Sequence, residues 1–158
     1  MPNFLEGYFY NPTKGNINVS QVVEEILGYI EQKPEKLYDI VVGCDSSSGE
    51  EPYFPVAVVV LRKGEGGRFF LKKIAYKNRK FYTWKTRILE EVMLSCELAL
   101  ILRESFGDRV RYIHADIGES GATKDMIKEV TGLIRGNGFE PKIKPESFAA
   151  SSVADRYS

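Results

Sequence analysis

The order of extended and helical segments is the feature of this sequence that most constrains its fold. Three runs rich in β-branched and aromatic residues follow one another, and a long segment without Gly or Pro comes after them with helical spacing of its apolar residues. Beyond that segment, extended and helical stretches alternate. The predicted strands are residues 38–44, 55–62, 68–77, 110–116 and 139–143, and the predicted helices are residues 19–32, 83–106, 123–135 and 145–158.

This order predicts a mixed β-sheet. Strands joined by a short turn, such as KGEGG at 63–67, pair antiparallel, whereas strands joined through a helix pair in parallel. The chain has 158 residues, an ordinary length for one domain. We therefore predict a single α/β domain over residues 1–158, with a five-stranded mixed sheet flanked by helices. Residues 1–36 are expected to form an N-terminal extension whose helix is capped by Asn18 or Ser20.

Charge and composition limit the classes of function. Lys plus Arg and Asp plus Glu both number 22, so any attraction to nucleic acid has to come from a local basic patch. The two cysteines, Cys44 and Cys96, lie within apolar runs, which predicts buried free thiols and no zinc site. The first residues do not resemble a secretory signal, and no apolar stretch is long enough for a membrane span. We expect a cytoplasmic protein without membrane contact.

Two acidic residues lie at the carboxyl ends of apolar strands. Asp45 directly follows the first predicted strand, and Asp116 is the last residue of the fourth. Ligands of open α/β sheets bind beyond the carboxyl ends of neighbouring strands, and two carboxylates placed there repel unless a cation or a proton compensates them. The alternative is that each acid is a turn residue whose side chain bonds its own backbone.

The long predicted helix offers a third acid. Glu90, Glu97 and Glu104 repeat every seven positions and are expected to form a solvated face. Glu91 instead lies beside the apolar stripe, where a carboxylate needs a partner. That partner is either Arg87, four residues earlier, or a metal ion shared with Asp45, and we favour the metal.

Several segments together resemble a known family. They are FYNPTKGNI, IVVGCDSS, RILEEV, HADIG and AASSVADRY, and they resemble the YkuK-like family of the ribonuclease-H-like superfamily. The resemblance implies a ribonuclease-H-like fold and an acidic cluster in which Asp45, Glu91, Asp116 and Asp155 are both catalytic residues and metal ligands. Oxygen-only ligands favour Mg²⁺ or Mn²⁺. Asp155, in the predicted last helix, would by itself look like any surface residue.

Other residues have two interpretations each. His114 is either a packed core histidine or a proton-handling group near the metal, and Ser46 is a possible auxiliary residue beside Asp45. Cations and an aromatic residue between the third strand and the long helix form either a nucleic-acid-binding patch or an ordinary solvated corner with its tryptophan packed. The residues of this patch are Lys77, Arg79, Lys80, Trp84 and Lys85.

These features predict a metal-dependent nuclease-like domain that hydrolyses phosphodiester bonds of RNA, DNA or a hybrid by a two-metal mechanism. Two alternatives stay open. The first is a non-catalytic nucleic-acid-binding or adaptor module on the same fold, which the neutral net charge favours. The second is a phosphohydrolase acting on a small nucleotide.

Overall fold

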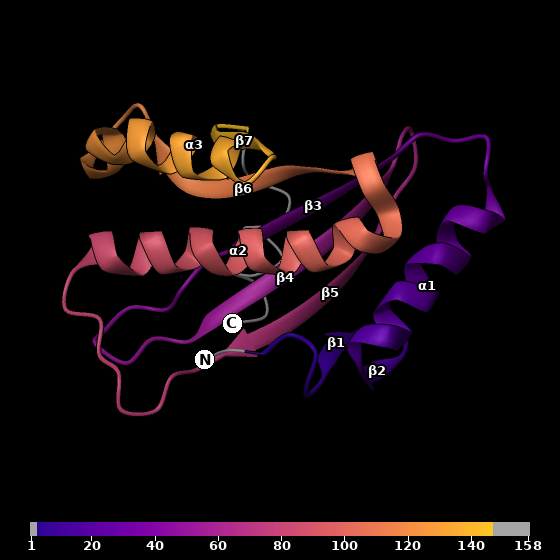
Figure 1. Ribbon diagram of the computed structural model, residues 1–158, viewed down its shortest axis with the longest axis horizontal. Coiled ribbons are helices and arrows are strands. Elements are labelled where there is room, and N and C mark those ends of the chain that lie inside the picture. The colour runs from indigo at the N-terminus through magenta and orange to yellow at the C-terminus, as the bar shows by residue number, and fades with distance from the viewer. Residues whose placement is uncertain (1–2, 147–158) are drawn as a thin grey trace.

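The computed structural model describes residues 3–146, and its centre is one seven-stranded sheet in the order β2-β1-β5-β4-β3-β6-β7 (Figure 1). The strands are β1 Phe9–Asn11, β2 Gly15–Ile17, β3 Tyr38–Cys44, β4 Phe54–Arg62, β5 Gly67–Ile74, β6 Val110–Gly118 and β7 Glu140–Lys144. The helices are α1 Val19–Gln32, α2 Trp84–Phe106 and α3 Ile127–Gly136, with short 3₁₀ helices η1 Gly107–Arg109 and η2 Ala122–Met126.

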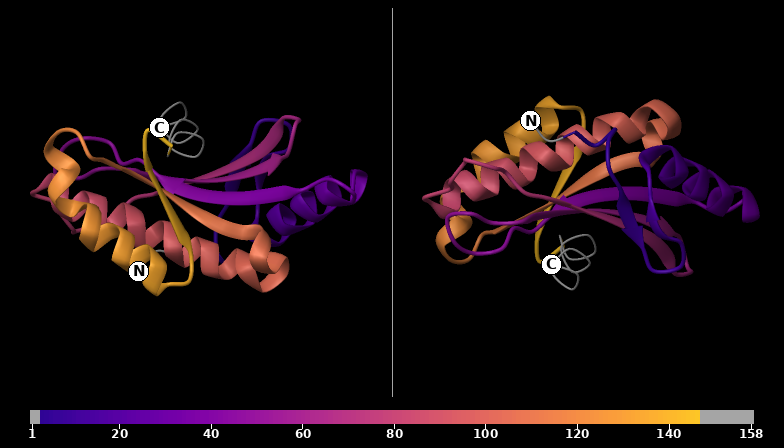
Figure 2. Two further views of the ribbon diagram at one scale, coloured as in Figure 1. Left: turned by 90° about the horizontal axis from the view of Figure 1, so that it is seen from above. Right: turned by 90° about the horizontal axis from the view of Figure 1, so that it is seen from below.

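The mixed sheet predicted from the segment order is confirmed. Strands β3, β4 and β5 form an antiparallel meander, and β6 and β7 add in parallel on the other side of β3. Helices α2 and α3 connect the parallel strands, and both lie on the same side of the sheet (Figure 2). Because of this arrangement, the carboxyl ends of β3 and β6 lie at the same end of the sheet.

The main core lies between the sheet and these helices. Apolar residues at helical spacing on α2, among them Leu94, Leu98 and Leu102, are buried against Val42 and Val58 of the central strands. A smaller cluster around Val41, Ala57, Val59 and Leu71 is buried on the opposite face of the sheet. Cys44 and Cys96 are free and buried, as predicted. Among the described residues, no helix combines the length and apolar character needed to cross a membrane.

The sheet has two strands more than the five predicted. Residues 1–36 contain the expected helix, α1, with a capping box between Asn18 and Gln21, but they also contain the β1–β2 hairpin. The hairpin joins the sheet because β1 pairs with β5, with Tyr10 opposite Leu71. Each of its strands has only three residues, which is too short for a period-two pattern to be recognised.

In the last third of the chain, the helix predicted over 123–135 begins later than expected. Thr123 does not cap a helix: it lies in η2, where its hydroxyl accepts a hydrogen bond from the Gly118 amide at 3.1 Å, and α3 begins only at Ile127. The helix predicted over 145–158, with Asp155 in it, lies almost entirely outside the described residues.

A buried arginine ties α1 to the central sheet. Arg62, at the end of β4, is 6% exposed, and its guanidinium donates to the Tyr29 carbonyl at 2.7 Å and to the Tyr38 hydroxyl at 3.0 Å. It also lies 3.8 Å from the centre of the Tyr29 ring and pairs with Glu65 at 3.4 Å. Burying a guanidinium requires this full set of partners, because each unpaired donor would cost free energy.

Replacing Arg62 by Met should therefore lower the melting temperature on the order of 10 °C, since the Tyr29 carbonyl and the Tyr38 hydroxyl lose their donor. Thermal unfolding followed by circular dichroism measures this loss. The exposed Arg109 provides the matched control, and Arg109→Met should leave the melting temperature nearly unchanged. Equal losses in the two variants would show that the Arg62 contacts contribute nothing specific.

Candidate functional site

Three of the four predicted acids line one pocket. Asp45 follows the last residue of β3, Glu91 lies on α2 and Asp116 lies near the end of β6, and all three border a pocket of about 340 Å³. We call it the acid pocket. The remaining wall comes from the serines after β3, from the start of α2 and η2, and from the end of β7, including Ser46, Trp84, Arg87, Thr123 and Lys144.

Glu91 is the buried acid of this pocket. Its residue is 6% exposed, and its Oε2 accepts hydrogen bonds from the Ser46 amide at 2.7 Å and from the Ser46 hydroxyl at 2.5 Å. Burial, with a smaller contribution from the charges of Asp45 and Asp116, raises the pKa of the Glu91 carboxyl to about 8 against the opposing effect of the Ser46 hydrogen bonds. The site therefore disfavours the charged form of Glu91 unless a cation is near.

Arg87, one of the two partners considered for Glu91 in the sequence, is not its hydrogen-bond donor. Arg87 donates to the Gly49 carbonyl at 3.3 Å, and Ser46 bonds the carboxylate. Ser46, predicted as an auxiliary residue, thus acts on the site by holding Glu91 in place.

The parallel pairing of β3 with β6 brings Asp45 and Asp116 to the same end of the sheet. Asp45 is the first residue beyond β3. In β6, Asp116 alternates with the buried residues Ile113, Ala115 and Ile117 of the main core. Both acids line the acid pocket, as a shared cation requires.

Lys144 lines this pocket although the sequence analysis did not predict it there. Its Nζ lies 2.8 Å from Oδ1 of Asp116, and this hydrogen bond raises the pKa of Lys144. Gly118 permits the approach: it pairs with Lys144 across β6 and β7, and a Cβ on Gly118 would lie 3.0 Å from the Lys144 Cβ.

The three acids supply the kind of ligand atom that a divalent cation prefers, but they are not close enough together to coordinate one. All three acids supply oxygen, the donor that Mg²⁺ and Mn²⁺ prefer. Among residues 3–146, however, no three acidic, histidine or cysteine side chains are gathered closely enough to hold a metal ion. Two of these acids already have partners, since Lys144 contacts Asp116 and Ser46 donates to Glu91. Asp155, the fourth predicted ligand, lies outside the described residues.

His114 is not part of the acid pocket. It is buried, and it lines a separate pocket with Tyr112 and Lys142. Burial lowers the pKa of the His114 imidazole to about 4, and the Lys142 charge adds to the effect. His114 is therefore neutral near pH 7, in keeping with the interpretation as a packed core histidine.

The predicted basic patch lies beside the acid pocket. Lys77, Arg79, Lys80 and Lys85 are exposed, whereas Trp84 is half-buried and lines the acid pocket itself. The Lys85 ammonium lies 5.7 Å from the centre of the Trp84 ring. The patch therefore adjoins the acid pocket at the first turn of α2, where Trp84 belongs to both.

Glu90 was predicted to be solvated from its position on the helix, but its side chain is largely buried. Its side chain is 14% exposed, pairs with Arg79 at 3.3 Å and accepts a hydrogen bond from the Tyr76 hydroxyl. The guanidinium of Arg79 also lies 4.6 Å from the centre of the buried Phe81 ring. Arg79 thus has a structural role, because it connects the loop before α2 to Glu90 on that helix.

Comparison with known proteins agrees with the topology. A family model described as ribonuclease H-like matches residues 21–158. The uncharacterized protein YkuK of Bacillus subtilis (strain 168) is 29% identical over 165 residues, which cover 94% of this chain and 95% of that protein. No solved structure matches the chain significantly.

Proposed function

Since the chain is a YkuK-like member of the ribonuclease H-like family, we propose that it is a Mg²⁺- or Mn²⁺-dependent nuclease with its active site in the acid pocket. The observation that supports this function best is the position of Glu91. A carboxylate buried at a pocket wall, with two further acids near enough to raise its pKa, needs a compensating cation to stay charged.

The proposed ligands are Asp45, Glu91 and Asp116, with Asp155 as the fourth by family resemblance. The chemistry that divalent ions supply at such a site is stabilisation of charge in an in-line displacement at phosphorus, together with activation of a water. Ser46 orients the Glu91 carboxylate through its amide and hydroxyl. Lys144 supplies a positive charge beside Asp116 that can contact a phosphate of the substrate.

The basic patch indicates a polymer as substrate. Exposed lysines attract successive phosphates, and Trp84, at the border between patch and pocket, offers a ring on which a base can stack. A strand bound along the patch would therefore reach the acid pocket.

A cleavage panel tests the proposal. The purified protein is incubated with Mn²⁺ and with single strands, duplexes, RNA–DNA hybrids and junctions, and Asp45→Asn serves as the control for contaminating nucleases. We expect cleavage of at least one class by the unmodified protein and none by Asp45→Asn. Mn²⁺ binding without cleavage of any class would contradict the proposal.

A nucleic-acid-binding module without turnover is the second candidate, and one observation favours it. The described acids are not gathered into a metal cluster, and Lys144 already neutralises Asp116. This function predicts nucleic-acid binding that is the same in EDTA and in Mn²⁺. The nuclease predicts tighter binding in the presence of a non-cleaving cation such as Ca²⁺.

The Lys144 contact leads to a specific expectation about metal affinity. Replacing Lys144 by Met removes a cation that competes for Asp116, so Mn²⁺ should bind about tenfold more tightly. Isothermal titration calorimetry measures this affinity. Cleavage should nevertheless become slower, because the positive charge beside the substrate phosphate is lost.

Lys142→Met is the matched control. Lys142 lies on the same strand and pairs with Glu146 at 3.6 Å, so its replacement makes the same charge change without freeing Asp116. An equal gain in Mn²⁺ affinity from both variants would mean that only net charge matters, and the specific role of Lys144 would be wrong.

A further inference from the structure

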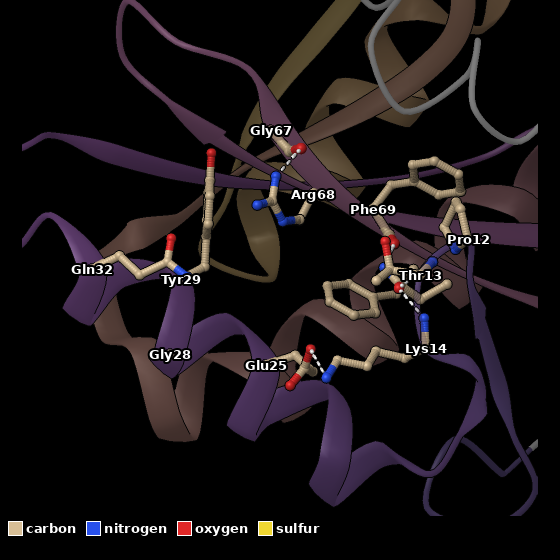
Figure 3. A pocket seen from close by; sticks show the side chains of 12 residues that line it. Pro12, Thr13, Lys14, Glu25, Gly28, Tyr29, Gln32, Gly67, Arg68 and Phe69 are labelled. Carbon is tan, nitrogen blue, oxygen red and sulfur yellow. Dashed lines mark hydrogen bonds and ion pairs between the residues drawn. The ribbon is translucent and has the colours of Figure 1, made fainter.

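A second pocket lies away from the acid pocket, between the β1–β2 hairpin, α1 and the start of β5. We call it the hairpin pocket; its volume is about 490 Å³. Figure 3 shows Arg68 and Tyr29 on one side of it and Thr13 and Lys14 on the other. The hairpin wall precedes residue 21, where the match to the ribonuclease H-like family begins. The pocket is therefore built partly from a segment added to that domain.

The hairpin turn is a fixed structure. Asn11 is 5% exposed, and its Oδ1 accepts hydrogen bonds from the amides of Thr13 at 3.0 Å and Lys14 at 2.9 Å. Its Nδ2 donates to the Phe69 carbonyl at 3.0 Å, which anchors the turn to β5. These bonds fix the backbone from which Thr13 and Lys14 extend into the pocket wall.

Gly28 leaves the helix side of the pocket open. It lies inside α1, where glycine weakens a helix, yet a Cβ built on it meets no atom within 4 Å. No neighbouring atom would clash with a side chain at this position, so packing does not explain the glycine. What the glycine provides is space in the pocket.

Two cations line this space. The Arg68 guanidinium lies 4.4 Å from the centre of the Tyr29 ring and donates to the Gly67 carbonyl at 3.2 Å, so the ring and the carbonyl orient it. Lys14 makes only a loose ion pair, 3.8 Å long, with Glu25, and both side chains are largely solvated. An oriented guanidinium has further N–H donors for a planar anion, and a weakly paired ammonium is available at small cost.

From these observations we propose that the hairpin pocket binds a phosphate monoester of nucleotide size, with the phosphate between Arg68 and Lys14 and the remainder over Gly28. Two cations against the single acid Glu25 favour an anion, and a doubly charged phosphate gains more from both cations than a carboxylate does. The volume is in the range of pockets that hold small ligands. The ligand is either a free mononucleotide or the 5′-phosphorylated end of a strand.

Calorimetric titration of the whole protein in EDTA tests this inference, since chelation removes any metal-dependent binding at the acid pocket. The probes are adenosine monophosphate, adenosine, and a short DNA strand with and without a 5′-phosphate. We expect each phosphorylated probe to bind at least about tenfold more tightly than its unphosphorylated counterpart. Tighter binding of the mononucleotide identifies the free ligand, and tighter binding of the phosphorylated strand identifies the strand end.

Three variants locate the binding site. Gly28→Leu fills the pocket and should abolish binding, whereas Gly132→Leu, at an equally open helical glycine of α3, should not. Arg68→Gln should weaken binding about tenfold. Glu25→Gln should strengthen it, because it frees Lys14 and removes the opposing charge.

The outcomes separate this inference from the proposed nuclease. Asp45→Asn should bind adenosine monophosphate as tightly as the unmodified protein does, even if it has lost cleavage. No binding of either phosphorylated probe, or unchanged binding in Gly28→Leu, would overturn the hairpin pocket as a phosphate site and leave the acid-pocket proposal standing.

Discussion

Replacing Glu91 by Gln is expected to reduce Mn²⁺-dependent cleavage roughly a thousandfold, because the substitution removes a ligand charge from the acid pocket and leaves its shape unchanged. Gln keeps an oxygen that can accept the Ser46 hydrogen bonds, so the packing of α2 against β3 should persist. Single-turnover cleavage with saturating Mn²⁺ measures the loss.

Glu90→Gln is the matched control for this variant. It makes the same change one residue earlier on α2, at a side chain that contacts Tyr76 and Arg79 and does not line the acid pocket. Cleavage should fall far less than in Glu91→Gln. If Glu90→Gln were the more damaging substitution, the metal would have been assigned to the wrong face of α2.

The same substitution at Glu91 should stabilise the metal-free protein at high pH. The folded pKa of Glu91, about 8, lies above its ordinary value of 4.5, so the folded state binds a proton that the unfolded state releases between these values. Stability in EDTA therefore falls as pH rises through this window. Gln, which does not titrate, avoids the loss.

Melting temperatures in EDTA at about pH 5 and about pH 9 measure this effect. Glu91→Gln should match the unmodified protein at the lower pH and exceed it at the higher one. A constant difference between the two proteins would mean that burial does not penalise the Glu91 charge. A gain in stability together with a loss of cleavage would indicate that this carboxylate serves function at the expense of the fold.

The sequence was sufficient to predict the features that repeat with a regular period. The end of β3 at Cys44 followed from an apolar run closed by Asp45, and Glu91 was distinguished from Glu90 by its angular position on α2. Both depend on local geometry, which three or four neighbouring residues determine. The meeting of Asp45 and Asp116 in one pocket then follows from the parallel pairing of β3 with β6, and α2 contributes Glu91 to the same pocket.

Features that depend on contacts between distant segments could not be predicted in this way. Lys144 reaches Asp116 because the pairing of β6 with β7 shifts between His114 and Gly118, and no local pattern announces such a shift. Glu90 is shielded by Tyr76, which precedes α2 in a loop. The β1–β2 hairpin exists because β5 offers it a partner, and its own three-residue strands give too little signal.

The basic patch should determine whether the substrate is a polymer. Each lysine that contacts a phosphate releases counterions, so replacing Lys77, Lys80 and Lys85 together by Gln should weaken oligonucleotide binding about a hundredfold at low salt. The slope of log affinity against log salt concentration should become shallower by about 2 for a single strand, since each of the three lost contacts contributes about 0.7. Fluorescence anisotropy over a salt series measures both quantities.

Arg79 is changed separately because it also holds Glu90 and lies over Phe81. Adding Arg79→Gln to the triple variant should weaken binding further. The melting temperature of this quadruple variant then shows whether the extra loss of affinity comes from a missing phosphate contact or from destabilisation of the loop that Arg79 holds. A loss of affinity without a loss of stability would assign Arg79 to the nucleic acid.

The decisive comparison uses a triple variant with the same charge change elsewhere. Lys63, Arg109 and Arg135 are exposed and lie outside the patch, so their replacement by Gln lowers net charge equally but should leave the salt slope nearly unchanged. Hydrolysis of a small phosphodiester should be similar in both variants, because none of the six substituted residues lines the acid pocket. If the two triple variants bound oligonucleotides equally well, the polymer would have to follow another path to Glu91, or the substrate would be a small nucleotide.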